Sequence, residues 1–81
     1  MSAKAILKEI CETALLMPRR TRVSRTVDGI RVSLQMFSLT EGLWTLQLPD
    51  GERFTTTSVH EAEIKLSDAL SKVGAARGAL L

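Results

Sequence analysis

Apolar residues recur three and four positions apart near the start of the chain, which is the spacing of one face of a helix. Charged residues such as Lys8, Glu9 and Glu12 fall off this stripe. The pattern predicts a helix over residues 3–17, because the residue before Pro18 resists the helical region of backbone conformation. The stripe that we expect to be buried consists of Ile6, Leu7, Ile10, Cys11, Ala14 and Leu15.

After this helix the apolar positions change to a period of two, which is typical of strands with one buried face. The Asp-Gly pair at residues 28–29 lies between two such segments and is a strong signal for a two-residue hairpin loop. The first segment, about 21–27, is less regular because Arg25 would point toward the core. We therefore expect three or four strands. The hairpin predicts the pairs Val27 with Ile30, Arg25 with Val32 and Val23 with Leu34.

A Thr-Glu-Gly sequence at residues 40–42 predicts the second hairpin loop. Three-residue loops of this kind place glycine at the position that requires a positive φ. Face parity supports this loop, because slipping by one residue would put Trp44, Leu46 and Leu48 opposite polar side chains. The expected pairs are Leu39 with Leu43, Met36 with Leu46 and Leu34 with Leu48.

A third turn is predicted at residues 49–51, with the sequence Pro-Asp-Gly. A two-residue loop there would send Phe54 to the polar face, whereas a three-residue loop places it beside Leu46. We therefore expect the three-residue loop. The antiparallel sheet then extends over residues 21–57.

The last helix begins with a capping box at residues 58–61, in which Ser58 accepts from the Glu61 amide and the Glu61 side chain reaches back. The helix is predicted over residues 58–74, and Gly74 suggests that residues 75–81 form a flexible tail. Its expected buried stripe consists of Val59, Ala62, Leu66, Ala69, Leu70 and Val73.

Together these elements predict one α+β domain over residues 1–81. It has an N-terminal helix, a three- to four-stranded antiparallel meander and a C-terminal helix. Each helix has one apolar stripe and the sheet has one apolar face, so the economical packing puts both helices on that face. The other face of the sheet is left open.

Composition argues against catalysis and against a membrane protein. Cys11 is the only cysteine and His60 the only histidine, so there is no disulfide framework and no cluster of soft metal ligands. No nucleotide-binding, metalloprotease or redox motif is present, and no apolar run approaches the roughly 20 residues of a membrane span. We expect a soluble, cytoplasmic, non-enzymatic protein with no catalytic residue, no metal and no cofactor.

The net charge of +2 hides a local excess of positive charge, since residues 19–31 hold five arginines and one aspartate. On the predicted register the open face displays arginine, hydroxyl and amide groups and almost no carboxylate. Such groups donate to phosphate oxygens and base edges, although an ordinary solvated β face has a similar composition. The candidate binding residues are Arg19, Arg20, Arg22, Arg31, Ser33, Gln35, Thr45, Gln47 and Arg53.

One end of the expected open face breaks the polar pattern. Phe37, Leu39 and Leu43 would gather there around the second hairpin loop. Exposed apolar groups at a sheet end suggest a protein contact or a homodimer. The alternative is that residues 78–81 cover them.

The segment 42–54 contains a Gly-x-Trp strand followed by an Asp-Gly turn. It leads into a helix whose start has the sequence Thr-Ser-x-x-Glu-Ala, at residues 57–62. Over about residues 29–73 this order resembles the three-strand-plus-helix DNA-binding module of plant AP2 domains and of the arm-binding domains of tyrosine integrases. In that family the sheet enters the major groove. The resemblance implies DNA contacts by Arg31, Ser33, Thr45, Gln47 and Arg53.

The order helix, three strands, helix is also similar to the double-stranded-RNA-binding fold, but residues 58–63 lack the lysine pair that this family uses. Two hypotheses on function follow. The first is a small regulatory protein that binds nucleic acid through a basic sheet face. The second is a protein-binding regulator or inhibitor, of the phage or plasmid accessory type such as an anti-CRISPR, whose arginines dock on an acidic protein surface.

Overall fold

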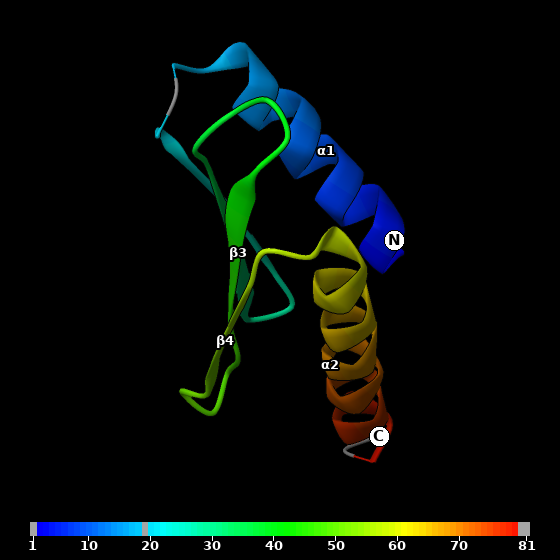
Figure 1. Cartoon of the computed structure of the whole chain (residues 1–81). Helices are drawn as coiled ribbons and strands as arrows, with labels where there is room; N and C mark the ends of the chain where they lie inside the picture. The colour runs from blue at the N-terminus through cyan, green and yellow to red at the C-terminus, as the bar shows by residue number, and fades with distance from the viewer. Residues whose placement is uncertain (1, 19, 80–81) are drawn as a thin grey trace.

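Two helices pack on one face of a four-stranded antiparallel sheet whose strands lie in the order β1-β2-β3-β4 (Figure 1). The computed structural model describes residues 2–18 and 20–79. This architecture confirms the predicted α+β class and the meander, with the weaker first strand included. The elements are α1 (Ala3–Leu16), β1 (Arg22–Val27), β2 (Ile30–Met36), β3 (Gly42–Gln47), β4 (Arg53–Thr56) and α2 (Val59–Ala79).

Local chemistry sets both ends of α1. The Ser2 hydroxyl accepts from the Ala5 amide at 3.2 Å, which satisfies one of the amides that have no partner inside the helix. At the other end Met17, the residue before Pro18, has an extended backbone, as the proline requires. The helix therefore ends within one residue of the predicted position.

The β1–β2 hairpin has the predicted two-residue loop. Asp28 and Gly29 both have positive φ, at 51° and 82°, which is the conformation that matches the twist of the flanking strands. The register also agrees with the prediction, with the pairs Val27–Ile30, Arg25–Val32 and Val23–Leu34.

The β2–β3 connection is longer than predicted, and the predicted pairing of these strands is wrong. Met36 pairs with Gly42, and Leu34 pairs with Trp44 instead of Leu48, so residues 37–41 form a five-residue loop. The Ser38 hydroxyl stabilises this loop by accepting from two backbone amides. Gly42 does not have a positive φ, so the reason for glycine is space. A Cβ there would lie 2.6 Å from Met36 Sδ and 2.9 Å from Leu34 Cδ1.

The β3–β4 hairpin has the predicted three-residue loop, and Phe54 pairs with Leu46. The Leu48 amide donates to the Glu52 carbonyl at 2.8 Å, which closes the hairpin around residues 49–51. Gly51 has a φ of 94°, a conformation that glycine adopts without steric cost.

The cap of α2 keeps half of the predicted capping box. The Glu61 amide donates to the Ser58 hydroxyl at 3.3 Å. The Glu61 carboxylate, however, accepts from the Thr56 hydroxyl at 2.8 Å, and that hydroxyl in turn accepts from the Ser58 amide at 3.0 Å. Thr56 therefore mediates the second bond of the box and connects the last strand to the helix.

Two details of α2 differ from prediction. The helix continues through Gly74 to Ala79, so the flexible tail expected over residues 75–81 is helical as far as Ala79, and residues 80–81 lie outside the described part. Glycine inside a helix costs about 1 kcal/mol but does not by itself end one. Val59, the first residue of α2, is 56% exposed rather than buried.

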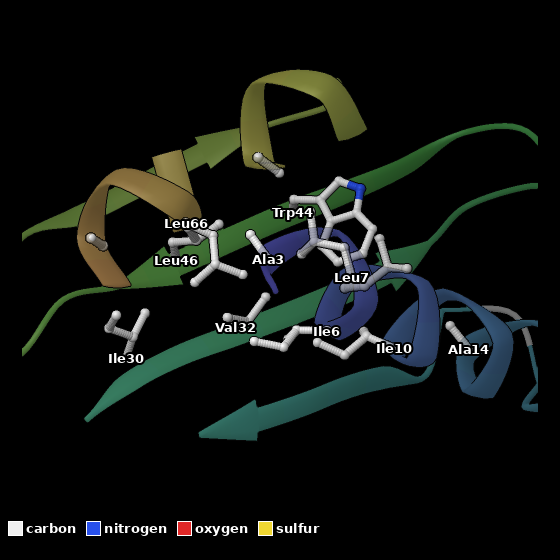
Figure 2. Packing of buried hydrophobic residues seen from close by; sticks show 13 residues of the cluster. Ala3, Ile6, Leu7, Ile10, Ala14, Ile30, Val32, Trp44, Leu46 and Leu66 are labelled. Carbon is white, nitrogen blue, oxygen red and sulfur yellow. The ribbon is translucent and has the colours of Figure 1, made fainter. Parts of the chain in front are cut away.

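Both helices cover the same face of the sheet, α1 over β1 and β2 and α2 over β3 and β4. Figure 2 shows the apolar side chains of the two helices and the central strands pointing into the layer between them. The core is almost entirely aliphatic, with Trp44 as its one aromatic residue. Its buried members are Ala3, Ile6, Leu7, Ile10, Ala14, Ile30, Val32, Leu34, Trp44, Leu46, Ala62, Leu66 and Ala69.

Candidate functional site

The face of the sheet opposite the helices, hereafter the open face, carries three rows of side chains that cross the strands. Residues directly opposite one another in neighbouring strands point to the same face, so the pairing of the strands defines each row. The middle row consists of hydroxyl groups, and arginines lie in the rows on either side. The rows are Arg22, Gln35 and Leu43; Ser24, Ser33, Thr45 and Thr55; and Thr26, Arg31, Gln47 and Arg53.

The open face is hollowed at its centre. A depression of about 300 Å³, the open-face hollow, is lined by side chains from all four strands. Six of the nine predicted binding residues contribute to it, and Leu43 and Thr55 complete the lining. The members are Arg22, Arg31, Ser33, Leu43, Thr45, Gln47, Arg53 and Thr55.

Strand geometry spaces the three arginines widely. Arg31 and Arg53 lie in one row on either side of Gln47, two strand spacings apart, so their Cα atoms are separated by about 10 Å. Arg22 lies in the row at the opposite end, four residues along the strands, so its Cα atom is about 14 Å from that of Arg31 and about 20 Å from that of Arg53. Long arginine side chains at both ends, with hydroxyl groups between them, suit a ligand that carries several separate anionic groups.

The ion pairs between described residues lie away from the hollow. The ion pairs in the described part of the chain are Glu9 with Arg25, Glu52 with Lys65, and Asp68 with Lys72. The first two lie on the helix side of the sheet and the third on α2. None of them involves an arginine of the hollow.

Arg25 provides the contrast within the same strand as Arg22. Its side chain points to the helix side of β1, where it pairs with Glu9 of α1 and is 35% exposed. This ion pair explains how an arginine is accommodated at the position that made the first strand look irregular. The arginines of β1 therefore have different environments, a structural one at Arg25 and an open one at Arg22.

Gln35 has a structural role. Its side-chain amide donates to the Arg20 carbonyl at 3.0 Å, and the Arg20 amide donates to the Met36 carbonyl at 2.9 Å. These bonds hold Arg20 in a left-handed conformation, with φ at 68°, just before β1 begins. Neither Gln35 nor Arg20 lines the hollow, and Arg19 lies outside the described residues.

The apolar residues proposed as an interface do not share one surface. Leu43 lines the open-face hollow, whereas Leu39 lines a second depression on the helix side, together with Met36 and Trp44. Phe37 is 46% exposed in the loop between β2 and β3. The five-residue loop causes this separation, because it takes Phe37 and Leu39 out of the strands.

The groups with catalytic potential lie apart from the hollow. His60 is exposed in the first turn of α2, and Cys11 is half-buried on α1. Within residues 2–18 and 20–79, no three side chains of histidine, cysteine, aspartate or glutamate are placed to hold a metal ion. The arrangement of the hollow supports binding of anions by arginine, hydroxyl and amide groups.

None of the helices in the described part combines the length and apolar character needed to cross a bilayer. The chain matches no known family model, no curated protein and no solved structure. The chemistry of the open face is therefore the feature that indicates a function.

Proposed function

We propose that the protein binds duplex nucleic acid, without catalysis, through the open-face hollow. The observation that carries this proposal is the presence of three arginines on a sheet face whose rows contain no carboxylate. Arginine presents several N–H donors in a planar fork that matches phosphate oxygens. Three uncompensated guanidinium groups in one hollow thus provide phosphate contacts without the cost of first breaking an internal ion pair.

The other groups of the hollow fit the same partner. Thr45 and Thr55 offer hydroxyl groups to phosphate or sugar oxygens, and Gln47 offers an amide that can pair with a base edge. Ser33 also lines the hollow but is only 7% exposed. The rows of the open face contain no aromatic side chain, because Trp44 and Phe54 point to the helix side. A single-stranded partner would require such aromatics for base stacking, so the composition favours a duplex.

The resemblance to the AP2 and integrase arm-binding module is consistent with the same partner. The segment that carries it corresponds to β2, β3, β4 and the start of α2. The strand positions that the resemblance assigns to DNA contact are Arg31, Ser33, Thr45, Gln47 and Arg53, and all five line the hollow.

The test is a titration of labelled duplex DNA, followed by fluorescence anisotropy, at several salt concentrations. Counterion release predicts that log Kd changes linearly with log salt, with a slope of about 0.9 per phosphate contacted. Arg31→Ala and Arg53→Ala should each reduce this slope by about one contact. Arg25→Ala is the matched control, because it removes the same charge from the helix side and should leave the slope unchanged.

A Kd weaker than about 10⁻⁴ M at roughly 50 mM salt would refute the proposal, because even a weak non-specific binder of nucleic acid reaches that affinity. Loss of affinity at a single base position in Arg31→Ala would instead identify Arg31 as a reader of guanine. Circular dichroism of each variant checks that the fold is retained.

The second candidate is a protein-binding regulator or inhibitor of the phage or plasmid accessory type, and the low net charge of +2 favours it. The same arginines would then pair with carboxylates on an acidic protein surface. Pull-down from the native host with and without nuclease distinguishes the two. Retention of a protein after nuclease, together with no affinity for duplex or single strands, supports this candidate over the first.

A further inference from the structure

Two depressions on the helix side of the molecule adjoin each other. The first, about 330 Å³, lies between α1 and the start of α2, and the second, about 220 Å³, lies under the β2–β3 loop. Cys11 and Val59 line both, so the two lie side by side, and together they are called the helix-side groove hereafter. It lies on the opposite side of the sheet from the open-face hollow and is independent of the function proposed for that hollow.

The floor and walls of the groove are apolar. Leu7 forms part of the floor, and Val59 and Leu39 line the walls with 56% and 74% of their surface exposed. Leu15, which is 50% exposed, lies one helical turn beyond Cys11 on the same flank of α1. Large apolar side chains that gather at a groove in this way mark a contact surface for another protein.

The rim of the groove carries charges of both signs. Lys4, Lys8, Glu12 and Glu63 line the depression between the helices. None of the four takes part in an ion pair within the part of the chain that the structure describes. A strongly acidic or strongly basic partner would repel half of this rim, whereas a partner with the same mixed pattern would not.

A second copy of the chain has that pattern. Lys8 and Glu12 are four residues apart and lie on one flank of α1. When two such helices run antiparallel across a twofold axis, Lys8 of each copy meets Glu12 of the other. The axis then passes between Lys8 and Glu12, beside Cys11, and the apolar floor of each groove is covered by the flank of the other α1.

From this geometry we infer that the helix-side groove is the interface of a homodimer in which the α1 helices pack antiparallel. Val59, Leu15 and Leu39 of each copy contribute apolar contacts, and the lysine–glutamate pairs set the direction and register. The two open faces point outward on opposite sides of the dimer, because the grooves lie on the helix sides.

Charge exchange across the axis tests this arrangement without nucleic acid. In Glu12→Lys both interfacial pairs become lysine against lysine, and in Lys8→Glu both become glutamate against glutamate. Each variant alone should dimerise roughly tenfold more weakly than the wild type in sedimentation equilibrium. An equimolar mixture of the two should form a heterodimer of near wild-type affinity, because each lysine then meets a glutamate again.

Restoration in the mixture also shows that both variants fold. A wild-type chain that stays monomeric near 1 mM would overturn the inference, and so would a dimer that neither single variant weakens.

A short bis-maleimide reagent provides a second measurement, since Cys11 is the only cysteine in the chain. It should cross-link the wild type, but not a Cys11→Ser variant that carries Ser24→Cys on the open face. The reverse result would place the interface on the open face.

Discussion

Gly42 decides how β2 and β3 pair, and substituting it tests the register directly. An alanine Cβ would lie 2.6 Å from Met36 Sδ and 2.9 Å from Leu34 Cδ1, both closer than van der Waals contact permits. Met36 is half-buried and can move, but Leu34 is 1% exposed and packs against the core. The Gly42→Ala variant therefore overfills a site that cannot expand freely.

The expected cost follows from two opposing effects. Overpacking of a core by one methyl group typically destabilises by about 1–3 kcal/mol. Loss of glycine's freedom in the unfolded chain offsets roughly 0.4–1 kcal/mol of this. We expect a net loss of about 1–2 kcal/mol, which moves the urea midpoint by about 1–2 M if the m-value is near 1 kcal/mol/M. Fluorescence of the buried Trp44, which pairs with Leu34 and lies two residues from Gly42, reports the transition.

Gly42→Asn distinguishes the observed register from the three-residue loop that the sequence suggested. In that loop Gly42 would have a positive φ, a conformation that asparagine tolerates better than alanine. At a position limited by space, the larger asparagine should lower the free energy of unfolding by roughly 3 kcal/mol, which is more than alanine does. If Gly42→Asn and Gly42→Ala have the same free energy of unfolding, the reasoning is refuted.

Gly74→Ala is the control, because nothing lies within 4 Å of its Cβ position. This change should stabilise α2 by about 0.5–1 kcal/mol.

Three further predictions concern stability, each measured by urea denaturation. Leu46→Ala should cost about 2–5 kcal/mol, because Leu46 is fully buried on a central strand, while Gln47→Ala on the open face should change stability by less than about 0.5 kcal/mol. Gln35→Ala should cost about 0.5–1.5 kcal/mol through loss of its bond to the backbone before β1, and a silent variant would argue against that bond. Ser58→Ala should cost about 1 kcal/mol by removing the acceptor for the Glu61 amide, and an unchanged midpoint would place the start of α2 elsewhere.

The parts of the fold that sequence predicted well are those that local chemistry determines. Residues 28–29 dictate a two-residue loop, and that loop length fixes the whole register of β1 and β2. Pro18 fixes the end of α1 in the same way. The alternation of apolar and polar residues then assigns each strand position to the helix side or to the open face, so it predicts six residues of the hollow.

The errors arose where the deciding interaction is not local. Alternation cannot distinguish a three-residue loop from a five-residue loop, because both place Trp44 on the same face. The choice depends on the absence of a Cβ beneath Leu34 and on the bonds of the Ser38 hydroxyl. Leu43 was consequently assigned to an apolar cluster with Leu39, although it lies in the hollow among the arginines.

The Arg25–Glu9 ion pair also protects the exposed edge of the sheet. β1 is an edge strand of six residues without proline, and such edges invite strands from other molecules to add on and start aggregation. An incoming strand would have to place its helix-side residues next to the Arg25 guanidinium, which already has its partner in α1. A charge directed inward from an edge strand discourages such growth. At the opposite edge β4 has only four residues, which offers too short a template. The two edges of the sheet are therefore protected differently, β1 by the inward charge of Arg25 and β4 by its short length.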